Sequence, residues 1–143
     1  MCWRCEQGRS VLIPSGPNPG QRHLFALLIN PVEVSGYGKR PHVLMVCMCS
    51  IKDGVPFDDA CILEVGDHPF VQHRSYIDYK FCEMRSADDI EAKVQNGTFV
   101  PHEDCPIPLI RRIIASADAS NRISREMKRF LKAVELPPIG GAS

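Results

Sequence analysis

Short runs of apolar residues separated by turn-forming segments occupy the first 84 positions. Five of these runs, at residues 10–14, 23–30, 42–51, 61–65 and 75–84, have the length and bounding Gly, Pro, Asn and Asp residues typical of β-strands. The run at 42–51 is apolar at almost every position, which predicts a central strand covered on both faces. In the run at 75–84 apolar and polar residues alternate untidily, which indicates a strand with both faces partly covered.

After residue 85 the spacing of apolar residues becomes helical. Ser86 is a good N-cap, acids at 88 and 89 suit a first helical turn, and Gly97 is suited to end that helix. Pro106 and Pro108 open a second helix, where a missing N–H costs little. The apolar stripes of the second helix and of a third one beyond residue 121 are Leu109, Ile110, Ile113 and Ile114, and then Ile123, Met127, Phe130, Leu131 and Val134.

Strands followed by helices predict an α+β fold in which a small, curled antiparallel sheet is followed by C-terminal helices. We divide the chain into a flexible N-terminus (1–9), a β-barrel core with appended helices (10–118), a C-terminal amphipathic helix (119–135) and a loose tail (136–143).

The length and charge of the chain narrow the function classes. A chain of 143 residues suits one hydrophobic core. Its 17 basic and 17 acidic residues cancel, so any binding of nucleic acid requires a local patch. No apolar run approaches the roughly 20 residues that span a bilayer, and the first residues are polar. We therefore expect a cytoplasmic protein without membrane contact.

Seven cysteines, an odd number, argue against a disulfide framework. Cys2 and Cys5 have the spacing of half a zinc site, but a second half is needed. Cys47 and Cys49 are a poor second half, because they lie in an apolar strand with both sulfurs on one face. We expect no metal and no other cofactor; a zinc-dependent module using Cys2 and Cys5 is the alternative.

The connector at residues 66–76 is the segment richest in functional groups. Asp67, His68, Arg74 and Tyr76 are candidate substrate-binding residues, and His73 is a candidate for proton transfer near neutral pH. The alternative is a well-packed turn in which Asp67 accepts turn hydrogen bonds and the aromatic residues fill the core.

A second group of candidates lies where two predicted strands meet. Arg22 and His23 precede one strand, and Ser50 closes the central one. In an antiparallel pair the start of one strand lies near the end of its partner, so Arg22 and Ser50 would approach each other. An arginine beside a hydroxyl suits a phosphodiester, because the guanidinium stabilises charge on the phosphorus in the transition state. The alternative for Arg22 is a solvated loop charge.

A basic run near the C-terminus is the third candidate. Residues 111–135 contain seven cationic and three acidic side chains. They form either a nucleic-acid patch or the solvated face of an amphipathic helix.

The order of these elements resembles the PemK/MazF family of toxin–antitoxin toxins. The likeness covers about residues 8–116. It rests on the opening segment GRSVLIP, the loop ending at Arg22, the central strand ending in Cys49 and Ser50, and the Gly97-Thr98-Phe99 link before a terminal helix. Two positions depart from the family pattern. Arg22 is followed by His23 where the family has proline, and the family's threonine before Ser50 is lost or replaced by Cys49.

The resemblance implies an SH3-like barrel and a metal-independent endoribonuclease that forms a homodimer and binds RNA and an antitoxin-like protein. Its catalytic roles would fall on Arg22, which stabilises the phosphate, and Ser50, which positions it, with His23 or His73 moving the proton. The alternative is a non-catalytic protein-interaction module of a phage or host defence or regulatory system. Neutral charge and the amphipathic helix at 121–134 favour that alternative.

Overall fold

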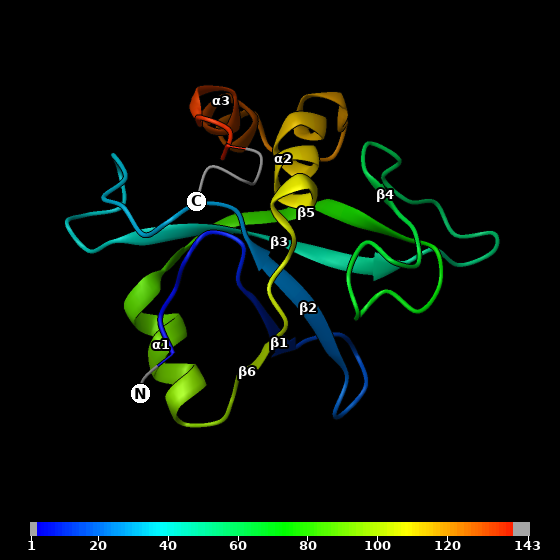
Figure 1. Cartoon of the computed structure of the whole chain (residues 1–143), viewed down its shortest axis with the longest axis horizontal. Helices are drawn as coiled ribbons and strands as arrows, with labels where there is room; N and C mark the ends of the chain where they lie inside the picture. The colour runs from blue at the N-terminus through cyan, green and yellow to red at the C-terminus, as the bar shows by residue number, and fades with distance from the viewer. Residues whose placement is uncertain (1–2, 139–143) are drawn as a thin grey trace.

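Six strands form one antiparallel sheet in the computed structural model, which describes residues 3–138. The sheet curls into a half-barrel and is followed by C-terminal helices, which confirms the α+β prediction (Figure 1). Its spatial order is β4-β5-β3-β2-β1-β6. The strands are β1 (Ser10–Pro14), β2 (Arg22–Leu27), β3 (His42–Ser50), β4 (Ile62–Leu63), β5 (Ser75–Ser86) and β6 (Val100–His102).

In the described part of the chain, three α-helices flank the sheet: α1 (Ala87–Gln95), α2 (Ile107–Ser116) and α3 (Arg125–Ala133). A short 3-10 turn, η1 (Ala117–Ala119), separates the last two. In Figure 1, α2 and α3 stand above β3 and β5, and α1 lies below them. The Ser86 side chain accepts a hydrogen bond from the Asp89 N–H, which confirms the predicted N-cap of α1.

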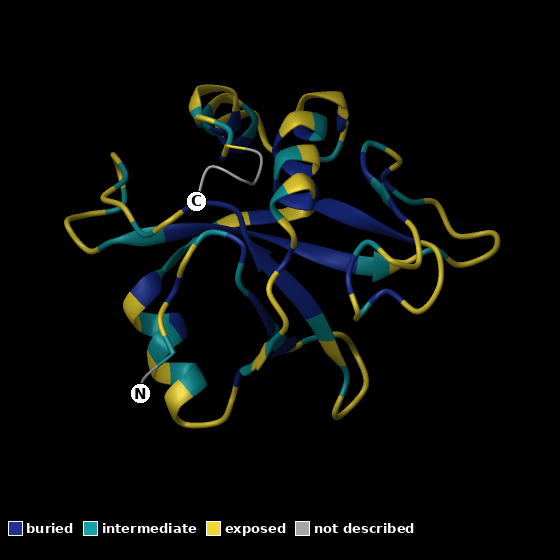
Figure 2. Ribbon diagram, in the orientation of Figure 1, coloured by how far each residue is buried: buried dark blue, intermediate teal, exposed yellow. Residues whose placement is uncertain are grey.

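The core lies on both faces of the central strands, which are dark in Figure 2. Residues 43–48 of β3 are all buried, as the apolar run predicted. All four predicted apolar positions of α2 are buried, and so are Met127 and Leu131 of α3. The buried Tyr79 hydroxyl donates to the Ile113 carbonyl at 2.6 Å and ties β5 to α2.

All five predicted strands are present, and β6 is a sixth strand in a segment that the sequence indicated only as extended. It pairs with β1 through the register Ser10↔His102 to Leu12↔Val100. Three residues including Pro101 carry no strand periodicity, and proline cannot donate to a ladder. β6 can hold a proline because it lies at the edge of the sheet, with β1 on one side only.

Residues 3–9 pack against the core instead of forming the expected flexible N-terminus. Cys5 is buried, and its N–H donates to the Glu91 carboxylate of α1 at 2.9 Å. The Gly8 N–H donates to the Leu27 carbonyl at 2.8 Å. At the other end, Pro137 is buried and accepts a hydrogen bond from Arg111, while 139–143 lie outside the described residues. Within residues 3–138, no helix combines the length and apolar character that crossing a bilayer requires.

Candidate functional site

A cavity of about 480 Å³ opens where β2 begins, β3 ends and β5 begins. The sheet register explains the meeting point: Leu24 pairs with Met48, and Ser50 pairs with Ser75. Antiparallel pairing therefore brings the start of β2 and the start of β5 to the end of β3. The cavity is lined by all four predicted catalytic residues, Arg22, His23, Ser50 and His73, together with Tyr76.

Ser50 and His73, which both line the cavity, form a direct hydrogen bond. The serine Oγ lies 2.7 Å from the histidine Nε2, and both side chains are exposed. In one neutral tautomer the hydroxyl donates to Nε2; in the other, the Nε2 proton is donated to Oγ. The two side chains therefore present an exchangeable proton and a hydroxyl group to a molecule bound in the cavity.

His23 is held by a neighbour outside the cavity. Its Nδ1 lies 2.5 Å from the Ser15 hydroxyl oxygen, which is also 3.2 Å from the Ile13 carbonyl. If Ser15 donates its proton to the Ile13 carbonyl, His23 Nδ1–H donates to Ser15 and Nε2 carries the free lone pair. If Ser15 donates to Nδ1 instead, Nε2 carries the proton.

The charged residues that line the cavity are cationic. Arg22 and Lys52 both line it, and none of its lining residues in the described chain is acidic. No carboxylate of residues 3–138 forms an ion pair with either side chain. Two lining cations without an ion-pair partner among residues 3–138, beside two imidazoles, favour an anionic ligand, while the Asp78 charge acts on the part of the wall formed by Cys49 and Tyr76.

Aromatic side chains form the apolar wall of the cavity. Phe57 and Tyr76 pack with ring centroids 5.5 Å apart and an interplanar angle of 43°, and Phe70 also lines the space. Burial, with Cys49 as a further cause, raises the pKa of Tyr76 to about 12, so the phenol stays neutral. A cationic rim and an aromatic wall together suit a ligand with a phosphate and a planar base.

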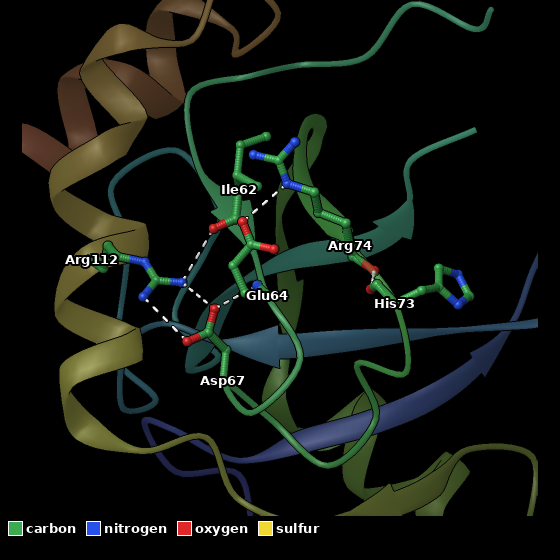
Figure 3. Close-up of polar contacts among 7 residues, drawn as sticks. Ile62, Glu64, Asp67, His73, Arg74 and Arg112 are labelled. Carbon is green, nitrogen blue, oxygen red and sulfur yellow. Dashed lines mark hydrogen bonds and ion pairs between the residues drawn. The ribbon is translucent and has the colours of Figure 1, made fainter. Parts of the chain in front are cut away.

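Asp67 and Arg74 do not line this cavity. Figure 3 shows Arg112 of α2 reaching Asp67, and Arg74 reaching Glu64, while the His73 ring points away from this network. The Arg112–Asp67 ion pair measures 2.7 Å and the Arg74–Glu64 pair 3.0 Å. The Arg112 guanidinium lowers the pKa of Asp67. The Arg112–Asp67 pair attaches the connector to α2, and Asp67 also accepts a turn hydrogen bond from the Glu64 N–H at 2.8 Å.

His68 is also separate from the cavity and is buried. Its Nε2 lies 2.7 Å from the Glu103 carbonyl, and its Nδ1 lies 3.0 Å from the Phe70 N–H. A carbonyl only accepts and an N–H only donates, so Nε2 carries the proton and Nδ1 accepts. Burial lowers the pKa of His68, which keeps this imidazole neutral.

Sequence reasoning missed Lys52, Phe57 and Phe70 as lining residues. Lys52 follows the central strand by two positions, and its charge so close to Ser50 in the chain was a signal that could have identified it. The sequence contained no indication that Phe57 lines the cavity, because its position depends on how the loop after β3 folds back over β5.

Much of the basic C-terminal run is used within the chain. Arg112 pairs with Asp67, Lys132 lies 3.1 Å from Asp118, and Arg122 lies 3.9 Å from the buried Asp78. Internal pairing of these cations weakens the case for a nucleic-acid patch along α2 and α3.

The structure gives Cys5 a packing role. Its sulfur donates to the Ala87 carbonyl at 3.7 Å, and Cys2 lies outside the described residues. Residues 3–138 contain no cluster of three or more His, Cys, Asp or Glu side chains placed to hold a metal.

Comparisons with protein-family models, with curated proteins and with solved structures gave no match for this chain. Its function has to be inferred from the cavity itself.

Proposed function

We propose that the cavity binds RNA at a backbone phosphate and cleaves the adjacent phosphodiester bond without a metal ion, as the PemK/MazF resemblance implies. The observation that carries the proposal is the meeting of Arg22, His23, Ser50 and His73 in one cavity whose described lining has no carboxylate. An RNA phosphate needs cations for its charge, and its cleavage needs groups that accept and donate a proton.

The proposed reaction uses the ribose 2′-hydroxyl as the nucleophile. His73 removes the 2′-hydroxyl proton, the 2′-oxygen attacks phosphorus, and the bond to the 5′-oxygen breaks. Protonated His23 gives its proton to that leaving oxygen, so the products are a 2′,3′-cyclic phosphate and a free 5′-hydroxyl. Arg22 stabilises the charge that grows on the non-bridging oxygens, and Ser50 orients the phosphate.

The test is a cleavage assay on a mixed-sequence single-stranded RNA with wild type and three variants. Arg22→Ala should lower the rate about 10²–10³-fold, and His73→Ala about 10²–10⁴-fold. Ser50→Ala should give a smaller loss, because it removes an orienting group. A strand with 2′-deoxyribose throughout should stay intact, because it lacks the nucleophile.

Matched controls come from the same chain. Arg74→Ala removes a neighbouring arginine whose guanidinium pairs with Glu64, and His42→Ala removes an imidazole that contacts the Arg40 carbonyl. Both should cleave at the wild-type rate. Wild-type rates in Arg22→Ala and His73→Ala would reject the mechanism. In cells, induced wild type should slow growth and Arg22→Ala should not.

The protein-interaction alternative loses one of its supports in the structure. The stripe residues Met127 and Leu131 of α3 are buried against the rest of the chain, so they do not offer an apolar face to a partner. A homodimer and an antitoxin-like partner stay predictions, and sedimentation of the purified protein tests the first of them.

A further inference from the structure

Cys49 is a thiol in the wall of the cavity, directly before Ser50 in the chain. Six cysteines lie within residues 3–138; five are buried and Cys49 is partly exposed. Its sulfur lies 3.6 Å from the sulfur of Cys47, two residues earlier on the same strand. An accessible thiol next to a second, buried thiol is the arrangement of a reactive cysteine and its resolving partner.

The surroundings favour the thiolate at Cys49. The hydrogen bond between the two thiols is the main reason that the pKa of Cys49 is lowered, and the Tyr76 hydroxyl and Lys52 act in the same direction. Burial and the charge of Asp78 oppose them. The same hydrogen bond, together with burial, raises the pKa of Cys47. Cys49 is also the more exposed of the two thiols, so it is the one that meets peroxide first.

We propose that Cys49 is a site of oxidation by hydrogen peroxide, that Cys47 resolves it as a disulfide, and that this disulfide switches the cavity off. The last clause rests on the proposed function. The Cys49 thiolate attacks one peroxide oxygen, the O–O bond breaks, and hydroxide leaves and becomes water. The Cys47 sulfur then attacks the sulfenic sulfur, the S–S bond forms, and the S–O bond breaks with loss of a second water. The two thiols lose two electrons, which the peroxide gains.

Strand geometry explains why the disulfide affects the cavity. Residues two apart on a strand have Cα atoms about 6.4–6.8 Å apart, the upper end of the range that a disulfide accepts. Bonding brings the sulfurs from 3.6 Å to about 2.05 Å, so the end of β3 has to contract. Ser50 is the next residue, and its 2.7 Å contact with His73 is lost in that movement. A disulfide whose Cα–Cα distance lies at the upper end of the accepted range is readily reduced, which makes the switch reversible.

The test treats the reduced full chain with hydrogen peroxide and measures intact mass, RNA cleavage and the ring NMR signals of His73. Wild type should lose about 2 Da, with the disulfide mapped to the peptide that holds Cys47 and Cys49. Cleavage should fall about tenfold or more, the His73 signals should shift, and dithiothreitol should restore all three. Cys49→Ser should show none of these changes, and Cys47→Ser should trap the sulfenic acid.

Two control variants protect the assignment. Cys2→Ser, at a position outside the described residues, and Cys82→Ser, at a buried thiol, should both react as wild type does. The NMR signals of His73 can be measured without RNA, so the experiment tests the oxidation of Cys49 and the proposed RNA cleavage independently of each other. A disulfide and a His73 shift in a protein that never cleaves RNA overturn the proposed function alone. Cleavage by the reduced protein without a Cys47–Cys49 disulfide after peroxide overturns the oxidation site.

Discussion

His68 gives the sharpest test of the structure, because one buried imidazole serves two backbone groups with two different atoms. In His68→Asn the amide oxygen can replace Nδ1 and accept the Phe70 N–H. The Glu103 carbonyl keeps a donor, since the Ser10 hydroxyl lies 2.6 Å from it. In His68→Gln the amide nitrogen can replace Nε2, but the Phe70 N–H is left without its acceptor. We expect a loss of about 0.5–1.5 kcal/mol for asparagine and about 1–3 kcal/mol for glutamine.

The buried His68 also makes the free energy of unfolding depend on pH. Burial lowers the pKa of folded His68 below its ordinary value of 6.5, so on acidification the unfolded chain takes up this proton first. The contribution of neutral His68 is complete above about pH 6.5 and is lost as the pH falls towards the folded pKa. The slope can reach about 1.4 kcal/mol per pH unit. Asparagine does not titrate, so the gap between wild type and His68→Asn should narrow from about pH 7.5 to about pH 5.

Urea unfolding followed by the fluorescence of Trp3, the one tryptophan, measures both effects. Trp3 packs against the core, so its emission reports unfolding. His42→Asn, at a histidine that is not fully buried, controls for the other imidazoles. Parallel pH curves for wild type and His68→Asn, or a larger loss for asparagine than for glutamine, would refute the assignment of the two ring nitrogens.

Three further predictions concern single contacts. Tyr79→Phe removes the hydroxyl that bonds the Ile113 carbonyl and should lower the free energy of urea unfolding by about 1–2 kcal/mol; an unchanged value would contradict that bond. Gly97→Ala places a side chain at φ +85°, with no atom within 4 Å of the new Cβ, so backbone strain alone should cost about 1–2 kcal/mol and lower Tm in calorimetry; a Tm at or above that of wild type would contradict it. Asp67→Asn loses the ion pair with Arg112 and should cost about 1 kcal/mol near neutral pH. The pKa of Asp67 lies below its ordinary 3.8, so that deficit should vanish as acid titration passes below this value, and a deficit constant with pH would argue against the pair.

The parts of the fold that follow local pattern could be predicted from the sequence. β1 begins and ends where its apolar run does, and β3 is buried on both faces as its composition indicated. The Ser86 cap and Gly97 gave the limits of α1. β6 could not be predicted as a strand from its own three residues, because it is extended through pairing with β1, which is far away in the chain.

The candidate site also contains residues whose positions follow from strand pairing and residues whose positions depend on distant contacts. Arg22 and Ser50 could be brought together from sequence because antiparallel pairing alone decides which strand ends meet. The connector could not be interpreted in that way. Whether Asp67 faces a substrate or a protein side chain depends on Arg112, 45 residues later, and His68 depends on the Glu103 carbonyl, 35 residues later. Composition identifies groups able to do chemistry, but only the tertiary fold shows which of them are already paired.

The pairing of β1 with β6 also bears on synthesis of the chain. His102, the partner of Ser10, is made 92 residues after it. At 5–20 residues per second, β1 waits about 5–20 s on the ribosome for its second neighbour. During that interval β2 can cover one side of β1, while the N–H and C=O groups of the other side stay open to another strand. A translational pause before Val100 would therefore lengthen the time in which nascent copies of this protein can pair with one another or recruit a chaperone.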